Sequence, residues 1–130
     1  FLLAASPVSV FKAGEAGYAC YRIPAVITAP SGDLLVFAEA RKEDCGDSGV
    51  IDLVVKRSGD QGNTWGSMTV AVPSELGTSG NPAPVVDRSS GDIILVFTRN
   101  PAEAREADIL RGDAPHRTVW VTRSEDDGLS

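Results

Sequence analysis

The sequence predicts an all-β fold made of β-propeller blades, and two observations carry that prediction. Apolar residues fall into short runs rich in Val, Ile and Leu, with turn signals between them and no convincing helical period. A unit of about four strands then occurs a second time along the chain, which is the size of one propeller blade. A β-sandwich is the alternative fold, but a sandwich does not require such a repeat.

The strands are expected in chain order, each bounded by residues that favour turns. They span residues 21–28, 33–40, 51–57, 68–72, 83–86, 92–98 and 118–123. The turns at 30–33, 60–63 and 89–92 each contain Gly and Asp. These residue types suit turns because Gly tolerates a left-handed backbone and the Asp side chain bonds to its own backbone.

The repeat has two parts with different offsets. The segment that starts at Pro24 recurs 58 to 59 residues later, and the segment that starts at Leu53 recurs 66 residues later. The longer offset indicates an insertion in the second unit. We therefore expect a first blade at about 17–72 and an incomplete second blade at about 81–130. Because one and a fraction blades leave open sheet edges, this piece alone is expected to be poorly stable.

Composition excludes several classes of protein. The chain has 130 residues, of which 42% are hydrophobic and 23% charged, as in globular proteins. Its net charge of −6 argues against a nucleic-acid partner, which would need a basic surface. No apolar run approaches the ~20 residues that span a bilayer. The start at 1–5 has no initiator Met and no preceding basic region, so we interpret it as a cut in a longer gene rather than as a complete signal peptide.

Two turns at corresponding places in the repeat resemble the Asp box, whose pattern is S-x-D-x-G-x-T-W. In such a turn the Asp carboxylate accepts backbone N–H bonds, Gly supplies special backbone angles and Trp packs under the blade. The second copy has Ser in place of Thr, and the chain ends where its Trp is due. We assign these turns a structural role, not a catalytic one. Their residues are Ser58, Asp60, Gly62, Thr64, Trp65, Ser124, Asp126 and Gly128.

The candidate site follows from the alternation of connections between the two faces of a blade. That alternation places the two Asp-box turns on one face. It places on the other face Arg22, Arg41, Asp44, Asp47 and the insertion 99–117. Arg22 begins an apolar strand near the propeller axis, where a guanidinium needs an anionic partner and suits a carboxylate. The alternative is an internal salt bridge from Arg22 to Glu39 or Glu43. Loops on a functional face commonly set specificity, although a solvated loop is the simpler interpretation of 99–117.

The segment Tyr21-Arg22-Ile23-Pro24 is similar to the YRIP motif of the exo-α-sialidase (neuraminidase) family, whose members carry Asp boxes. Residues 37–41 match the family's F-A-E-x-R, and Asp47 follows Arg41 by six residues, as the family's acid/base does. The resemblance covers roughly residues 17–130 and implies the first part of a six-bladed propeller. It implies that Arg22 clamps the carboxylate of sialic acid and that Arg41 supports the pocket around the ring.

The same resemblance implies that Asp47 protonates the leaving oxygen and later activates water. Asp44 is the competitor for this role, but its spacing from Arg41 differs from that of the family. Asn81, at the start of the second blade, is a candidate for contacts with the ring or glycerol group. Asp52 lies within a strand and is interpreted as structural, as a partner of a neighbouring Arg.

The implied activity is retaining hydrolysis of terminal α-linked sialic acid from glycans, glycoproteins or glycolipids. In this family a Tyr assisted by Glu attacks the anomeric carbon. A neutral nucleophile is suitable because the substrate already carries a carboxylate beside the reacting carbon. The nucleophile, its Glu and two further Arg are expected beyond Ser130, so the piece alone should be inactive. The alternatives are a trans-sialidase, a non-catalytic sialic-acid-binding propeller, and a propeller of another class that carries Asp boxes.

The cysteines bear on both the site and the compartment. Cys20 lies two residues before Arg22, and Cys45 lies two residues before Asp47. The two cysteines form either a disulfide or two free thiols. A disulfide would tie the loop that carries Asp47, here called the acid loop (residues 41–50), to the first strand. A disulfide suits a secreted protein, so we expect an extracellular location. No cofactor or metal is expected, because His116 stands alone without metal-ligand spacing around it.

Overall fold

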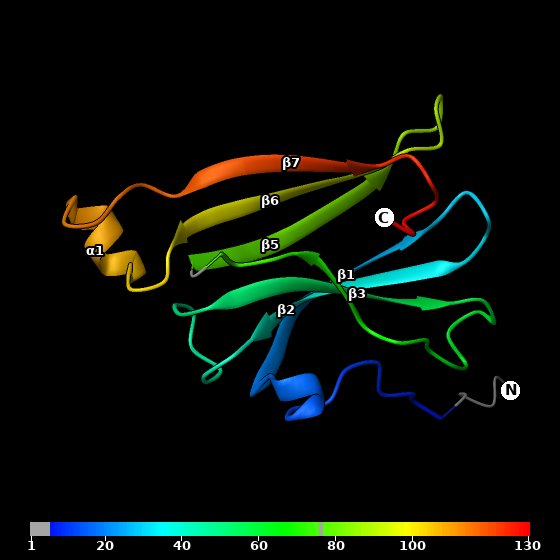
Figure 1. Cartoon of the computed structure of the whole chain (residues 1–130), viewed down its shortest axis with the longest axis horizontal. Coiled ribbons are helices and arrows are strands. Elements are labelled where there is room, and N and C mark those ends of the chain that lie inside the picture. Colours follow the sequence, from blue (N-terminus) through cyan, green and yellow to red (C-terminus); the bar gives the residue numbers. More distant parts are fainter. Residues whose placement is uncertain (1–5, 76) are drawn as a thin grey trace, which may run out of the picture.

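The computed structural model describes residues 6–75 and 77–130, and these residues form two antiparallel groups of strands (Figure 1). The first group consists of β1 (Cys20–Thr28), β2 (Leu34–Arg41), β3 (Ile51–Ser58) and β4 (Thr69–Val72), each paired with the next. The second group consists of β5 (Gly77–Val86), β6 (Ile93–Pro101) and β7 (Thr118–Ser124). A parallel bridge between Ile51 and Thr78 joins the groups. The start at 1–5, which we interpreted as a cut, lies outside the described residues.

The all-β prediction is confirmed, with three differences. The strand predicted at 92–98 continues to Pro101, which lies within the predicted insertion. The strand predicted at 83–86 begins six residues earlier, at Gly77, because a bulge between Gly80 and Ala83 lets the strand pass through a Pro. A short helix, α1 (Glu106–Arg111), lies in the insertion where no helix was expected. Six residues are too few for a periodic signal, and the helix ends where Gly112 adopts a left-handed φ of 79°. A 3-10 turn at Glu15–Gly17 precedes β1.

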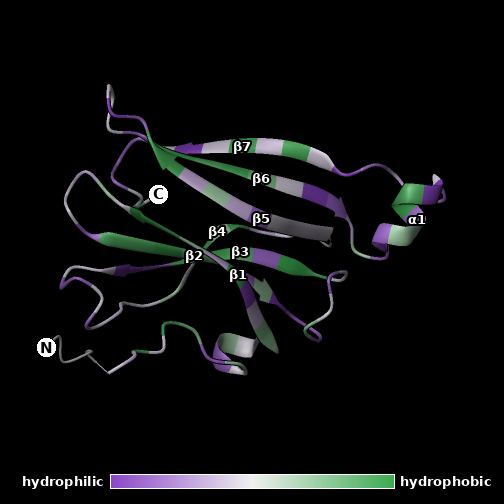
Figure 2. Ribbon diagram, turned by 180° about the vertical axis from the view of Figure 1, so that it is seen from behind, coloured by the Kyte–Doolittle hydropathy of each residue, from purple (hydrophilic) through white to green (hydrophobic). Residues whose placement is uncertain are grey.

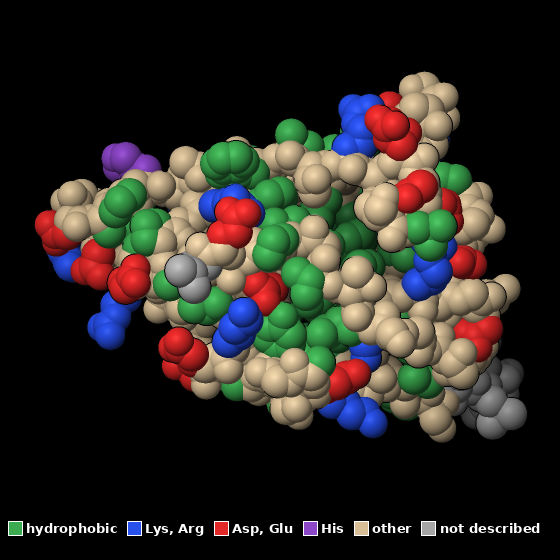
Figure 3. Space-filling model, viewed as in Figure 1, with side chains coloured by type: hydrophobic (Ala, Val, Ile, Leu, Met, Phe, Trp, Pro, Cys, Tyr) green, Lys and Arg blue, Asp and Glu red, His purple; other side chains and the backbone are tan. Residues whose placement is uncertain are grey.

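The strand β2 is buried on both faces because two layers cover it. On one face, Leu35 and Phe37 pack in a core that includes Ile93 and Leu95 of the second group. On the other face, Ala38 and its neighbours pack against Tyr18 and the segment that precedes β1. Stretches of β2 and β6 are accordingly coloured as hydrophobic in Figure 2. The space-filling view shows hydrophobic side chains between the two groups (Figure 3).

The two boxed turns share the hydrogen bonds that hold their Asp60 and Asp126 carboxylates. In the first, Asp60 accepts bonds from the Thr64 hydroxyl at 2.6 Å and the Thr64 N–H at 2.8 Å, and from the Ser58 hydroxyl at 2.8 Å. These bonds, led by that from the Thr64 side chain, lower the pKa of Asp60 to about 2. In the second turn Ser130 takes the place of Thr64 and donates both its hydroxyl and its N–H to Asp126. Both carboxylates are therefore occupied within their own turns.

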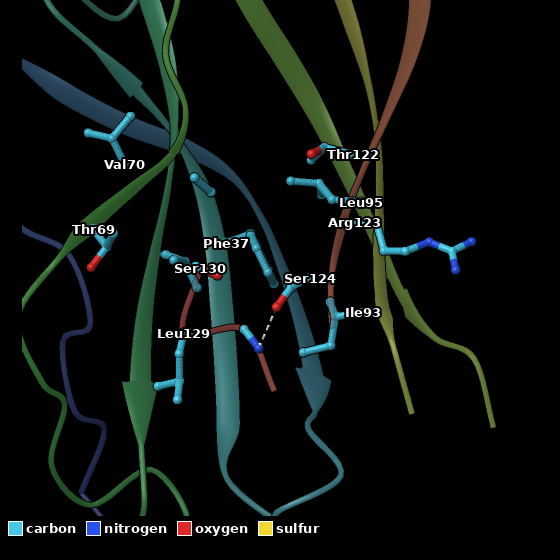
Figure 4. A pocket seen from close by; sticks show the side chains of 13 residues that line it. Phe37, Thr69, Val70, Ile93, Leu95, Thr122, Arg123, Ser124, Leu129 and Ser130 are labelled. Carbon is cyan, nitrogen blue, oxygen red and sulfur yellow. Dashed lines mark hydrogen bonds between the residues drawn. The ribbon is translucent and has the colours of Figure 1, made fainter. Parts of the chain in front are cut away.

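An apolar cavity of about 140 Å³ lies between the two groups, near the second boxed turn (Figure 4). Phe37 and Val55 line it from the first group, and Ile93 and Leu95 line it from the second. Beside this cavity, Arg57 of β3 pairs with Asp33 at 2.7 Å and with Asp127 at 3.0 Å, which ties the groups together at this end. We assign no chemistry to the cavity, because most of its lining is apolar and the hydroxyls of Ser124 and Ser130 are bonded to Asp126.

Within residues 6–75 and 77–130, neither the length nor the hydropathy of any helix suffices for crossing a membrane.

Candidate active site

A polar hollow of about 270 Å³ lies at the opposite end of the strands from the boxed turns. In Figure 1 this end is on the left, where α1 and the loop between β2 and β3 lie, and the boxed turns are on the right. The side chains on which its chemistry depends are Arg22, Glu39, Arg41, Asp47, Asn81 and Arg117. The alternation of connections therefore predicted the shared face correctly.

Strand register explains why these side chains meet. In the β1–β2 pair, Cys20 lies opposite Arg41, and Arg22 lies opposite Glu39. Directly opposed residues project to the same face, and alternate residues of one strand share that face. All four side chains therefore extend from the end of the face that packs against the second group, where Phe37 of β2 already belongs to the core.

The two residues that follow Arg22 and Gly80 carry unusual backbone conformations. Ile23 and Asn81 have φ values of 55° and 54°, and each precedes a Pro at an equivalent place in the repeat. A β-branched residue such as Ile rarely adopts positive φ. Each residue lies at a bulge, and each lines the polar hollow. Strained backbone of this kind is typical of functional sites.

Asp47 is held by two guanidinium groups. Its Oδ1 accepts hydrogen bonds from Nη1 of Arg22 at 2.8 Å and from Nη1 of Arg41 at 2.9 Å. The side chain of Asp47 remains 82% exposed. The bond from Arg41 and the positive charge of Arg22 lower the pKa of Asp47, which favours its ionised form.

Arg41 anchors the loop that carries Asp47. Its side chain is only 4% exposed, and its Nη1 also donates to the carbonyl oxygens of Cys45 at 2.7 Å and Gly46 at 2.5 Å. The opposite edge of the guanidinium pairs with Glu39. Arg41 therefore fixes the position of the loop that carries Asp47.

A disulfide joins Cys20 of β1 to Cys45 of the acid loop, with their Cα atoms 5.3 Å apart. The Cys45 carbonyl accepts hydrogen bonds from both Arg22 and Arg41. The loop is therefore tied covalently to β1 at the point where the two guanidinium groups hold its backbone.

Replacing both Cys20 and Cys45 with Ala is expected to lower the free energy of unfolding by about 2–4 kcal/mol, because the bridge closes a sizeable loop in the unfolded chain. Denaturant unfolding with and without reductant would measure this loss. Reductant should destabilise the wild type by a similar amount and leave the double variant unchanged. Equal stability of reduced and oxidised wild type would contradict the prediction.

Several known sialidases resemble this chain, although no family model matches it. The exo-alpha-sialidase of Aspergillus fumigatus is 34% identical over 86% of this chain, which covers 32% of that relative. The exo-alpha-sialidase of Arthroderma benhamiae is 32% identical over 89% of the chain, again covering 32% of the relative. The solved structure of Hadza microbial sialidase Hz136 superposes with a TM-score of 0.76 at 28% identity, covering 91% of this chain and 26% of that one.

The chain belongs to the sialidase family. It spans about a third of the length of these curated relatives, 32% in each case. The prediction of a partial β-propeller is confirmed, because the two strand groups match sialidase propeller structures over part of their length.

In this sialidase-family chain, the structure brings four sequence-derived site candidates together: Arg22, Arg41, Asp47 and Asn81. It separates Asp44 from them, because the Asp44 carboxylate accepts the N–H of Gly46 at 2.6 Å and does not reach either guanidinium. His116 does not line the hollow. Among the described residues, no cluster of His, Cys, Asp or Glu is arranged to hold a metal ion.

The structure does not contain the alternative ion pair considered for Arg22, and the Arg partner expected for Asp52 is wrong. Arg22 pairs with Asp47 and not with Glu39 or Glu43, because the acid loop folds back over β1 while Glu39 turns toward Arg41. Asp52 is structural, but its partner is not an Arg. It is buried and accepts bonds from the Tyr18 hydroxyl and the Ser74 N–H, both at 2.6 Å, with Lys42 at 3.4 Å.

Sequence reasoning missed part of the second wall of the hollow. Thr98 accepts a hydrogen bond from the Asn81 amide at 3.1 Å, and Asn100 accepts one from Nε of Arg117 at 3.3 Å. Gly80 lies between Thr98 and Glu39, where a side chain would collide with the Glu39 carboxylate. The available signal was the alternation of side chains along a strand, which places Thr98 and Asn100 on the same face of β6.

Proposed function

We propose that the protein containing this chain is a retaining exo-sialidase that releases terminal α-linked sialic acid from glycans, glycoproteins or glycolipids. The contact between Arg22 and Asp47 is the observation that carries the proposal, because both side chains line one hollow. A guanidinium is suited to binding a carboxylate, and a carboxyl group is suited to donating a proton. The names of the curated relatives agree with this activity.

Arg22 is the proposed clamp for the carboxylate of the substrate. Its side chain is 44% exposed at the hollow, and a guanidinium binds a carboxylate through parallel hydrogen bonds. Nη1 of that guanidinium also donates a hydrogen bond to Asp47. An arriving carboxylate competes with Asp47 for Arg22 and adds a negative charge beside it. Both effects favour the protonated form of Asp47, which can then donate its proton to the leaving oxygen.

Neither tyrosine of this chain is suited to be the nucleophile. The Tyr18 hydroxyl is buried and donates to Asp52, and burial followed by this bond raises the pKa of Tyr18. The Tyr21 hydroxyl donates to the Glu15 carbonyl at 2.7 Å. We therefore propose that the nucleophilic Tyr and its Glu lie outside this chain. The disulfide supports an extracellular location, since oxidising compartments preserve such bonds.

The complete protein, incubated with an α-sialyl oligosaccharide, tests this proposal. Release of free sialic acid supports hydrolysis, and formation of a new sialoside when a galactoside acceptor is added would indicate a trans-sialidase. Binding of sialic acid without turnover would overturn the enzymatic proposal in favour of a binding propeller. Inversion of the anomeric configuration in the first product would contradict the retaining mechanism.

In the pH profile of the rate, kcat is expected to fall on the alkaline side at a higher pH than kcat/KM does. Asp47 must be protonated to act as the acid, so the rate falls as pH rises through its pKa. The profile of kcat/KM reports the free protein, in which Arg41 and Arg22 lower the pKa of Asp47, and kcat reports the complex. Steady-state rates across pH with a substrate that has a poor leaving group would measure where each parameter falls. A fall of both at the same pH would contradict the expectation.

A further inference from the structure

Glu39 is a buried carboxylate that joins the two walls of the hollow. It lies on β2 and is only 4% exposed. Its Oε2 accepts hydrogen bonds from Nε of Arg41 at 3.1 Å and from Nη2 of Arg41 at 2.5 Å. Its Oε1 accepts the backbone N–H of Asn81 in the second strand group at 2.9 Å. Each oxygen therefore serves a different wall.

The second wall is shaped to receive this carboxylate. A Cβ built on Gly80 would lie 2.8 Å from Oε1 of Glu39, which is closer than real side chains approach. The same segment is fixed from the other side, where the Thr98 hydroxyl donates to the Gly80 carbonyl at 3.2 Å. Gly80 thus leaves the space that lets Glu39 reach the backbone of Asn81.

Only a carboxylate satisfies both neighbours of Glu39. The Asn81 N–H and the edge of the Arg41 guanidinium are donors, and a carboxylate offers an acceptor oxygen to each. A glutamine amide has one acceptor oxygen and one NH2 donor group. Its NH2 group would therefore face either the Arg41 guanidinium or the Asn81 N–H, both of which are donors. With glutamine at position 39, the buried guanidinium of Arg41 would also lose the negative charge that neutralises it.

We propose that Glu39 is a positioning residue that acts through Arg41 to set where Asp47 meets the substrate. This inference rests on the proposed sialidase function. Nε and Nη2 of Arg41 donate hydrogen bonds to Glu39. Nη1 of Arg41 donates to Asp47 and to the carbonyl oxygens of Cys45 and Gly46 in the acid loop. A shift of the guanidinium at its Glu39 edge therefore displaces the acid loop. Glu39 also keeps that loop at a fixed distance from Asn81 on the opposite wall.

The variant Glu39→Gln in the complete protein tests this role. We expect kcat for a substrate with a poor leaving group to fall on the order of 100-fold, because small displacements of a reacting group have effects of that size. An activated aryl sialoside needs little protonation, so its kcat should fall much less. The matched control is Glu43→Gln, which makes the same chemical change at an exposed position of the same segment and should stay within about 2-fold of wild type.

A second variant displaces the carboxylate without removing any charged group. Gly80→Ala would push the Glu39 carboxylate, since Oε1 is the end of a flexible side chain, and should show the same dependence on the leaving group. Equal losses on both substrates, or no loss in either variant, would overturn the positioning role.

Amide hydrogen exchange in residues 42–49 gives a readout that does not need activity. Exchange in this loop should be faster in Glu39→Gln than in wild type or Glu43→Gln, at equal global stability. Unchanged exchange would overturn the inference even if the wild type releases no sialic acid. A wild type without turnover would instead refute the proposed function, so the two failures are distinguishable.

Discussion

Replacing Asp47 with Ala in the complete protein is expected to lower kcat for natural sialosides by about 10²–10⁴-fold, the usual contribution of a positioned proton donor. The natural leaving group is a sugar hydroxyl, which leaves poorly unless its oxygen is protonated. Asp47 is the carboxyl group on the exposed loop beside Arg22, at 2.8 Å from Nη1. Activated aryl sialosides leave without such help, so their turnover should fall much less.

Steady-state kinetics on both classes of substrate would measure this difference. Asp44→Ala is the matched comparison, because Asp44 lies in the same exposed loop and bonds to the Gly46 N–H without touching either guanidinium. Its loss should be small and independent of the leaving group. An equal loss on both substrates in Asp47→Ala, or a larger loss in Asp44→Ala, would refute the assignment of Asp47 as the acid.

The parts of the fold that could be predicted are those whose signal is local. The strands at β2 and β3 begin and end within a residue of their predicted bounds, since runs of Val, Leu and Ile are flanked by Gly and Asp. The start of β5 could not be predicted, because Gly77–Gly80 consists of small residues with weak strand preference. These residues are extended because they pair with β6, which is a tertiary effect.

The site shows the same division between local and tertiary information. Alternation of the connections, together with the family's spacing, was enough to place Arg22 and Asp47 on one face. The choice of partner for Arg22 among Glu39, Glu43 and Asp47 depends on distances of a few ångströms. Those distances are set by contacts between segments remote in the chain, such as the bond from Asn81 to Glu39. No pattern along one strand contains that information.

Arg22→Ala is expected to lower kcat/KM for sialosides by about 30- to 1,000-fold, because losing one partner of a hydrogen-bonded charge pair costs roughly 2–4 kcal/mol. The lower end is favoured by the partial exposure of Arg22, which weakens ion pairs through solvent screening. Arg22→Lys should lie between alanine and wild type, since it retains the charge but not the two parallel donors.

The carboxylate of the substrate provides the decisive control for Arg22. A sialoside whose carboxylate is methylated cannot form the ion pair, so wild type and Arg22→Ala should process this ester with kcat/KM values within a few-fold of each other. The two changes should therefore be strongly non-additive when measured as a cycle of protein and substrate variants. If Arg22→Ala lowered kcat/KM by the same factor for the ester and for the free acid, Arg22 would be supporting the Asp47 loop instead of holding the substrate. The hydrogen bond from Arg22 to the Cys45 carbonyl at 3.1 Å makes that outcome physically distinct and measurable.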